Sequence, residues 1–126
     1  MSKTAELRKL ITEQLNTVPG ATYYRRARDN ASYPYKTFTL SRIALGDLSR
    51  DDHDLCIDIW DRSADPKTVD SIADSIEELL NAANLPQSTI LPTFYRDSRY
   101  PVDEDDKLLQ HVQLHITIQN YTTQGG

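Results

Sequence analysis

The segment from residue 55 to residue 83 constrains the fold most, because a strand pattern stands directly before a helix pattern. Side chains alternate at period two: Leu55, Ile57 and Ile59 on one face, Cys56, Asp58 and Trp60 on the other. This alternation is typical of a strand with one buried face. An apolar stripe at the helical period follows, made of Val69, Ile72, Ala73, Ile76, Leu79, Leu80 and Ala83. The two patterns together predict an amphipathic helix that packs on a sheet.

Two helices are predicted. Residues 3–16 carry one narrow apolar face, made of Leu7, Leu10, Ile11 and Leu15. Thr4 is the expected N-cap of this helix, and Pro19 with Gly20 ends it. The second helix has Ser63 or Asp65 as its cap and Pro66 at its first helical position.

Further strands are predicted before and after this central segment. Residues 22–26 form either a short strand or an extended segment, and Tyr33-Pro34-Tyr35 opens a longer strand that runs through Ser41. Residues 89–96 form another strand, in which Pro92 requires an edge or a bulge. The longest strand is residues 108–121, with Val112, Leu114, Ile116 and Ile118 facing inward.

The segments between these elements are polar. Residues 46–54 and 97–107 are rich in acidic side chains and have few apolar anchors, so both are predicted to be mobile loops. Residues 122–126 are predicted to fray. The 126 residues therefore predict a single α+β domain with element order α-β-β-α-β-β, in which two helices pack on one face of a mostly antiparallel sheet.

Charge and composition narrow the class of protein. The net charge of −5 argues against a groove for nucleic acid, which would be rich in Lys and Arg, and so against sequence-specific nucleic-acid binding. A single cysteine excludes an internal disulfide. The N-terminal residues lack the apolar core of a secretory signal, and no apolar stretch is long enough to span a bilayer. We therefore expect a protein made in the cytoplasm, without a membrane partner.

Three clusters of His, Asp or Cys side chains could suggest chemistry, but none predicts a catalytic, cofactor or metal site. His111 and His115 lie four residues apart on a strand, which separates their Cα atoms by roughly 13 Å, too far to share one ion. The acidic run at residues 51–54 lacks the EF-hand pattern. Cys56 near His53 could suggest a nucleophile, but a half-buried structural thiol is the simpler interpretation.

The candidate interface residues are charged or aromatic. Trp60 is a large aromatic side chain on the outer face of its strand, so we expect it to be buried, either by a loop or by a neighbouring subunit. The basic cluster is either a solvated surface or a contact to an acidic partner. The full candidate set is Arg25, Arg26, Arg28, Trp60, Tyr95, Tyr100, Asp103, Glu104, Asp105 and Asp106.

Three stretches resemble the tail completion proteins of siphophages, also known as tail-to-head joining or tail terminator proteins. The stretches are Tyr33-Pro34-Tyr35, Ile57-Asp58-Ile59-Trp60, and the helix from Val69 through Leu80. The first third and the chain length also fit, whereas the final third fits only in having an acidic loop before a long strand.

This resemblance implies a structural virion protein rather than an enzyme, located at the head–tail interface and without a cofactor. It implies a hexameric ring that caps the tail tube and joins it to the DNA-filled head. The expected partners are further copies of the chain, the tail tube protein and the head-completion or connector protein, with subunits that are monomeric before assembly. The alternative is a small α+β ligand-binding domain or enzyme, which a deep polar pocket with a perturbed titratable residue would favour.

Overall fold

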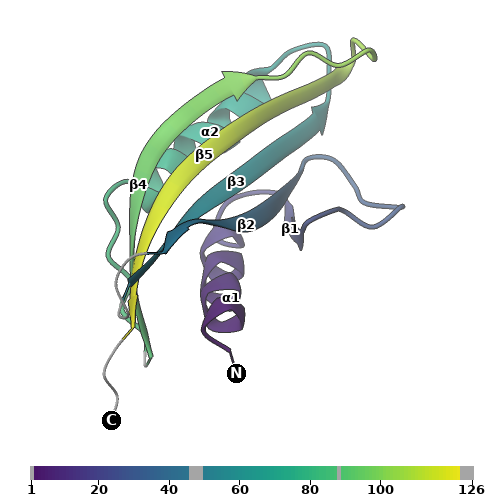
Figure 1. Ribbon diagram of the computed structural model, residues 1–126. Helices are drawn as coiled ribbons and strands as arrows, with labels where there is room; N and C mark the ends of the chain where they lie inside the picture. Colours follow the sequence, from purple (N-terminus) through teal and green to yellow (C-terminus); the bar gives the residue numbers. More distant parts are fainter. Residues whose placement is uncertain (1, 46–49, 88, 123–126) are drawn as a thin grey trace.

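The computed structural model describes residues 2–45, 50–87 and 89–122, and we make no structural statement about the remaining residues. Within these ranges the chain forms α1 (Lys3–Leu15), β1 (Ala21–Tyr24), β2 (Tyr35–Leu45), β3 (Arg50–Arg62), α2 (Lys67–Leu80), β4 (Ile90–Pro101) and β5 (Leu109–Thr122) (Figure 1). The predicted α+β class is confirmed. The observed order contains one strand more than the predicted α-β-β-α-β-β, because residues 21–24 do pair as the short strand β1.

The strands form one mostly antiparallel sheet in the order β1-β2-β3-β5-β4. Only β1 and β2 run parallel, while β2–β3, β3–β5 and β5–β4 are antiparallel. β4 lies at one edge of the sheet, which is where the sequence placed a strand containing Pro92. The central strands β3 and β5 pair over their whole length, from Arg50–Tyr121 to Arg62–Leu109.

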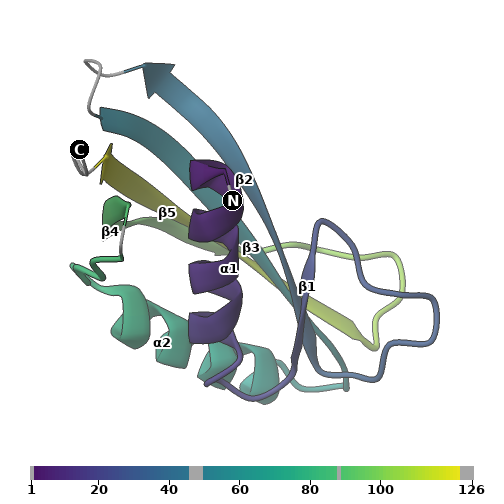
Figure 2. The same ribbon diagram turned by 90° about the horizontal axis from the view of Figure 1, so that it is seen from below.

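Both helices pack on the same face of the sheet, as predicted (Figures 1 and 2). The core between the layers is apolar: Leu7, Ile11 and Leu15 from α1 meet Val69, Ile72, Ala73, Ile76 and Leu80 from α2 and the inward side chains of the strands. Each fully buried Leu or Ile contributes about 1.5–3 kcal/mol to folding, so this layer is the main source of stability. Within the described residues, no helix covers the opposite face of the sheet, and we call it the open face.

Both helix starts differ from the prediction by one or two residues. Ser2, rather than Thr4, caps α1, because its hydroxyl accepts a hydrogen bond from the Ala5 N–H at 3.0 Å. α2 begins at Lys67, one residue after Pro66, and the Asp65 carboxylate accepts the Lys67 N–H at 2.8 Å. Asp65 is therefore the side chain that satisfies a free donor at this helix start.

Both predicted loops are shorter than expected, because charged residues at their borders join the sheet. Residues 50–54 belong to β3 and pair with β2 or β5, whereas residues 46–49 lie outside the described part of the chain. Residues 97–101 belong to β4, with an irregularity between Arg96 and Ser98. Backbone pairing with a neighbouring strand outweighs a charged composition here, since the charged side chains still reach solvent.

The loop between β4 and β5 thus comprises residues 102–108, and its mobility stays a prediction. At the C-terminus, Thr122 pairs with Ile90, so any fraying begins after it. Residues 123–126, the rest of the predicted frayed tail, lie outside the described residues.

Candidate assembly surface

Aromatic side chains line the open face at the end of the sheet where β2 begins. Tyr35 on β2 stands opposite Trp60 on β3, which in turn stands opposite His111 on β5. The Trp60 and His111 rings stack with centroids 3.7 Å apart, and Tyr35 lies 6.4 Å from Trp60 on its other side. Tyr33 extends this row, 5.3 Å from Tyr35, and is 42% exposed. The predicted need of Trp60 for cover is therefore met partly within the subunit, by a histidine that the sequence analysis placed on a polar outer face.

His111 is held between two carboxylates as well as stacked on Trp60. Its Nε2 lies 2.6 Å from an Asp58 oxygen, and its Nδ1 lies 2.9 Å from a Glu104 oxygen. Burial lowers the pKa of His111, but the hydrogen bonds to Asp58 and Glu104 outweigh it, so the pKa is raised overall. Only the imidazolium can donate to both carboxylates at once, so this arrangement favours the charged ring.

A second polar group continues along the open face. His115 lies 3.2 Å from the Asp54 carboxylate and 3.0 Å from the Tyr100 hydroxyl, which donates to Gln113 at 2.6 Å. Cys56 Sγ lies 4.0 Å from His115 Nε2. Burial, together with the neighbouring Asp58 and Asp54 carboxylates, raises the pKa of the Cys56 thiol to about 12.

The thiol therefore stays protonated at neutral pH and is no activated nucleophile. The pair of Cys56 with His53, which the sequence could suggest, does not form. His53 lies on the opposite, core-facing side of β3 and is buried. A spacing of three residues on a strand puts two side chains on opposite faces.

Tyr95 and Tyr100 lie on β4, and each is 42% exposed. By register they stand opposite Thr117 and Gln113, so both belong to the open face. Tyr100 joins the His115 group, which is consistent with the predicted role of these two tyrosines as exposed aromatic side chains.

The two charged regions predicted as interface lie at the same end of the sheet (Figures 1 and 2). Arg25, Arg26 and Arg28 are exposed and follow β1 directly. The acidic residues lie in the β4–β5 loop, on the other side of that end. Two of them are engaged within the subunit: Glu104 binds His111, and Asp106 binds Arg62 at 2.6 Å.

The remaining two acidic residues, Asp103 and Asp105, form no ion pair with any described residue. Both are exposed. They are thus the members of the predicted acidic set that stay available to a partner. Arg25 and Arg26 likewise form no ion pair within the described residues, whereas Arg28 lies over the Tyr23 ring, with its guanidinium carbon 6.0 Å from the ring centroid.

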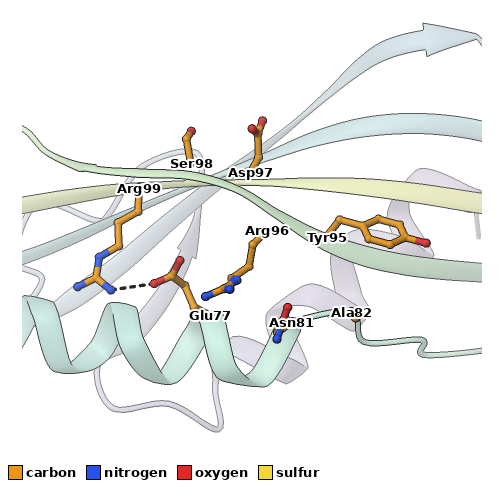
Figure 3. Close-up of a pocket in the computed structure, with 8 residues that line it drawn as sticks. All are labelled: Glu77, Asn81, Ala82, Tyr95, Arg96, Asp97, Ser98 and Arg99. Carbon is orange, nitrogen blue, oxygen red and sulfur yellow. Dashed lines mark hydrogen bonds and ion pairs between the residues drawn. The ribbon is translucent and has the colours of Figure 1, made fainter.

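A hollow of about 410 Å³ lies between α2 and β4 (Figure 3). Arg96 and Arg99 point from β4 toward the helix, and Arg99 binds Glu77 at 2.8 Å. Asn81 and Tyr95 line the same hollow. Burial lowers the pKa of Arg99, but bonds to Asp74 and Glu77 raise it overall, so Arg99 stays a cation and supplies no acid–base chemistry.

One buried charge was missed by the sequence analysis. Lys36 is fully buried on the core face of β2, and its ammonium donates to the carbonyls of Val18 at 3.1 Å, Pro19 at 3.0 Å and Gly20. These carbonyls form the turn between α1 and β1. A signal was present in the sequence, because Lys36 shares its parity with the inward Phe38 and Leu40.

No cluster of three or more His, Cys, Asp or Glu side chains that could hold a metal ion occurs among the residues the structure describes. In the same ranges, no helix combines the length and the apolar character needed to cross a membrane.

Comparison with known families gives a match over nearly the whole chain. The sequence model of the family "Tail completion protein gp17" matches residues 3–120. The chain belongs to the tail completion protein gp17 family. The resemblance expected from Tyr33-Pro34-Tyr35, Ile57-Asp58-Ile59-Trp60 and the α2 sequence is thereby confirmed.

Two solved structures share the fold of this tail completion protein. One belongs to the virion of a native gene transfer agent particle, with a TM-score of 0.69 and 13% identity, covering 89% of this chain and 84% of that chain. The other has a TM-score of 0.63 and 13% identity, covering 98% of this chain and 96% of that chain. The curated proteins gave no match.

Family membership defines the class of function. The protein is a structural component of the phage virion, located in the tail at the head–tail interface. It acts there within an assembly of tail and head proteins. The open face, the two charged loop regions and the sheet edges are the surfaces of this subunit that such an assembly has available.

Proposed function

We propose that this tail completion protein assembles as a hexameric ring that caps the tail tube and provides the surface joining the tail to the DNA-filled head. Its partners are neighbouring copies of itself, the tail tube protein and the head-completion or connector protein. No step in this role requires a covalent reaction, so the protein acts through binding surfaces and not as an enzyme.

One observation carries the proposal: a whole face of the sheet is left without helices, although it bears aromatic side chains. Tyr33, Tyr95 and Tyr100 are each 42% exposed, and Tyr35 and Trp60 are only partly buried. Aromatic side chains of this kind are the usual anchors of protein interfaces, because each buries a large area at a small cost in side-chain entropy. In a free monomer these aromatic side chains would remain exposed to water.

The charged loops support a specific orientation of the subunit. Arg25 and Arg26 on one side and Asp103 and Asp105 on the other lie at one end of the sheet and have no ionic partners among the described residues. Charges of this kind contribute specificity and association rate more than affinity. We infer that this end of the subunit meets a charged partner surface, with the aromatic side chains supplying most of the binding energy.

The alternative of a small ligand-binding domain or enzyme is less well supported. The hollow of Figure 3 contains Arg99, whose guanidinium is already bound to Glu77 and stays a cation, so this group cannot act as a general acid or base. The perturbed groups Lys36 and Cys56 lie elsewhere, in the core and on the open face.

A joining assay tests the proposal. Tails assembled in the absence of this protein are mixed with filled heads, with and without the purified protein, and complete particles are counted by electron microscopy and by infectivity. We expect joining only when the protein is added. Joining at the same level without it would contradict the proposed function.

A further inference from the structure

The outer edge of β1 has no strand partner within the described residues, and the outer edge of β4 has none after Phe94. β1 pairs only with β2, whereas β4 pairs with β5 and, over residues 90–94, also with residues 83–87. An unpaired strand edge is a ready surface for association with another chain, and proteins that stay monomeric usually cover or charge it. In this subunit the two edges carry charge of opposite sign.

The edge formed by α1 and β1 is basic, and we call it the basic edge. The Arg8 guanidinium lies over the Tyr24 ring, 4.6 Å from its centroid, which holds α1 against β1. Lys9 lines the same shallow hollow of about 390 Å³ between the helix and the strand. Arg25 and Arg26 follow at the end of β1, both exposed. Glu13 is the one acidic residue that lines this hollow.

The edge formed by α2 and β4 is acidic, and we call it the acidic edge. A single guanidinium, that of Arg99, faces three carboxylates: Asp74 at 2.6 Å, Glu77 at 2.8 Å and Asp70 at 3.5 Å. The side chains of Asp74 and Asp70 remain 72% and 52% exposed. Glu78, one turn after Asp74, is also exposed. The four carboxylates outnumber the two cations of this edge, Arg99 and the exposed Arg96, so negative charge is left facing solvent.

We propose that the basic edge of one subunit docks on the acidic edge of the next copy of this chain. The partner is a second copy because the two edges are complementary in charge and lie on opposite outer strands (Figure 2). Each edge also has a hollow beside its helix. A contact between two unlike patches is heterologous, and repeating it gives a closed ring when the rotation from one copy to the next closes on itself. This inference rests on the proposed ring and names the surfaces that build it.

Charge reversal at each edge tests the docking. The basic-edge variant carries Arg25→Glu and Arg26→Glu, and the acidic-edge variant carries Asp74→Lys and Glu78→Lys. A fourfold variant combines all four changes. The matched control, Arg62→Glu with Lys107→Glu, changes the net charge as much as the basic-edge variant, and its residues lie at the end of β3 and in the β4–β5 loop, outside both edges. Circular dichroism checks that each folds, and rings at tail-tube ends are counted by electron microscopy.

We expect rings with the wild type and the control, a loss of at least tenfold in each single-edge variant, and recovery in the fourfold variant, because opposite charges then face each other again. Mixing the two single-edge variants should also recover rings, because copies that alternate around a ring of even number meet at oppositely charged edges at every contact. Normal rings in both single-edge variants would overturn the edge assignment while leaving the ring intact. Absence of rings in the wild type would instead overturn the proposed function, and this inference with it.

Discussion

Lys36 lies in an environment that is unusual for a lysine side chain, because it is fully buried. Its ammonium is enclosed by the turn between α1 and β1, where it donates hydrogen bonds to backbone carbonyls that follow the end of α1. Burial lowers the pKa of Lys36 to about 8, while the carbonyl acceptors favour the protonated form. The side chain thus joins α1 to β2 through hydrogen bonds and not through an ion pair.

This environment predicts a pH dependence of stability. Because the folded chain releases the Lys36 proton near pH 8 and the unfolded chain near its ordinary value of about 10.5, the unfolded state binds more protons between these values. The contribution of Lys36 to the free energy of unfolding should therefore rise with pH across this window. Urea unfolding of the wild type and of Lys36→Met at several pH values measures this contribution. The free energy of unfolding of the wild type should increase relative to that of the variant as pH rises.

Lys36→Met should also lower stability by about 1–3 kcal/mol at neutral pH, because buried carbonyls lose their donor. A stability difference between wild type and variant that stays constant from pH 7 to 10 would contradict the lowered pKa. Direct titration of the lysine by NMR separates this result from a general effect of the substitution on packing.

Ile76 and Cys56 differ in what a substitution should do. Ile76 is fully buried in α2, so Ile76→Asp buries an unpaired carboxylate at a cost of several kcal/mol, comparable with the whole stability, and should unfold the subunit. Ser75→Asp, at the exposed neighbouring position, is the matched control and should leave the fold intact. Far-UV circular dichroism distinguishes the two.

Cys56→Ser should leave both the fold and head–tail joining unchanged, since the thiol is protonated and half buried. His115→Ala should behave in the same way in the joining assay. Folded Cys56→Ser protein that no longer joins heads to tails would point to thiol chemistry that this account does not contain.

At the scale of elements, the β4–β5 loop is tied to the open face by two charged contacts, Glu104 with His111 and Asp106 with Arg62. The raised pKa of His111 means that its stabilising contribution is present in full below the ordinary histidine value and is lost as pH rises through the folded-state value. We therefore predict that the loop becomes more mobile above neutral pH.

Amide order parameters of residues 102–108 at pH 6 and pH 8.5 test this prediction, with lower values expected at the higher pH. His111→Gln should abolish the difference and cost about 1–3 kcal/mol at pH 6, because it removes hydrogen bonds to two carboxylates. A loop as rigid as β5 at both pH values would contradict it.

The elements with clear periodicity were predictable from sequence. α2 and β5 each bury one continuous side. The start of α2 and both bounds of β5 were predicted within one residue, whereas the apolar stripe extended α2 to Ala83 and the helix ends at Leu80. The predicted borders of β3 and β4 were wrong, because the polar composition of residues 50–54 and 97–101 is typical of a loop. Their strand conformation depends on pairing with β2 and β5, which a single segment does not reveal.

The candidate surface was predictable only in part. Trp60 was found from strand parity, which is a local property, whereas Tyr95 and Tyr100 were predicted only as aromatic candidates, Tyr100 within a segment predicted to be a loop. The stacking of His111 on Trp60 and the engagement of Glu104 depend on which strands become neighbours, so they required the sheet order. The opposite charge of the two edges likewise becomes visible only once β1 and β4 are known to be the outer strands.

At the scale of the whole molecule, the proposed ring should be sensitive to salt. Exposed charges are screened over about 8 Å at physiological ionic strength and over about 3 Å at 1 M, so contacts that rely on them weaken as salt increases.

Arg25→Glu with Arg26→Glu should block joining of heads to tails without unfolding the subunit. If this double variant still gives particles at normal titre, the basic cluster is a solvated surface and the interface lies elsewhere.

The central claim concerns where the protein lies in the particle and in how many copies. Cryo-electron microscopy of the intact head–tail junction measures both directly. The account predicts a ring of about six copies between the tail tube and the head connector, each copy presenting an edge to its neighbour. A junction in which density for this fold is absent, or in which the chain lies elsewhere in the virion, would contradict it.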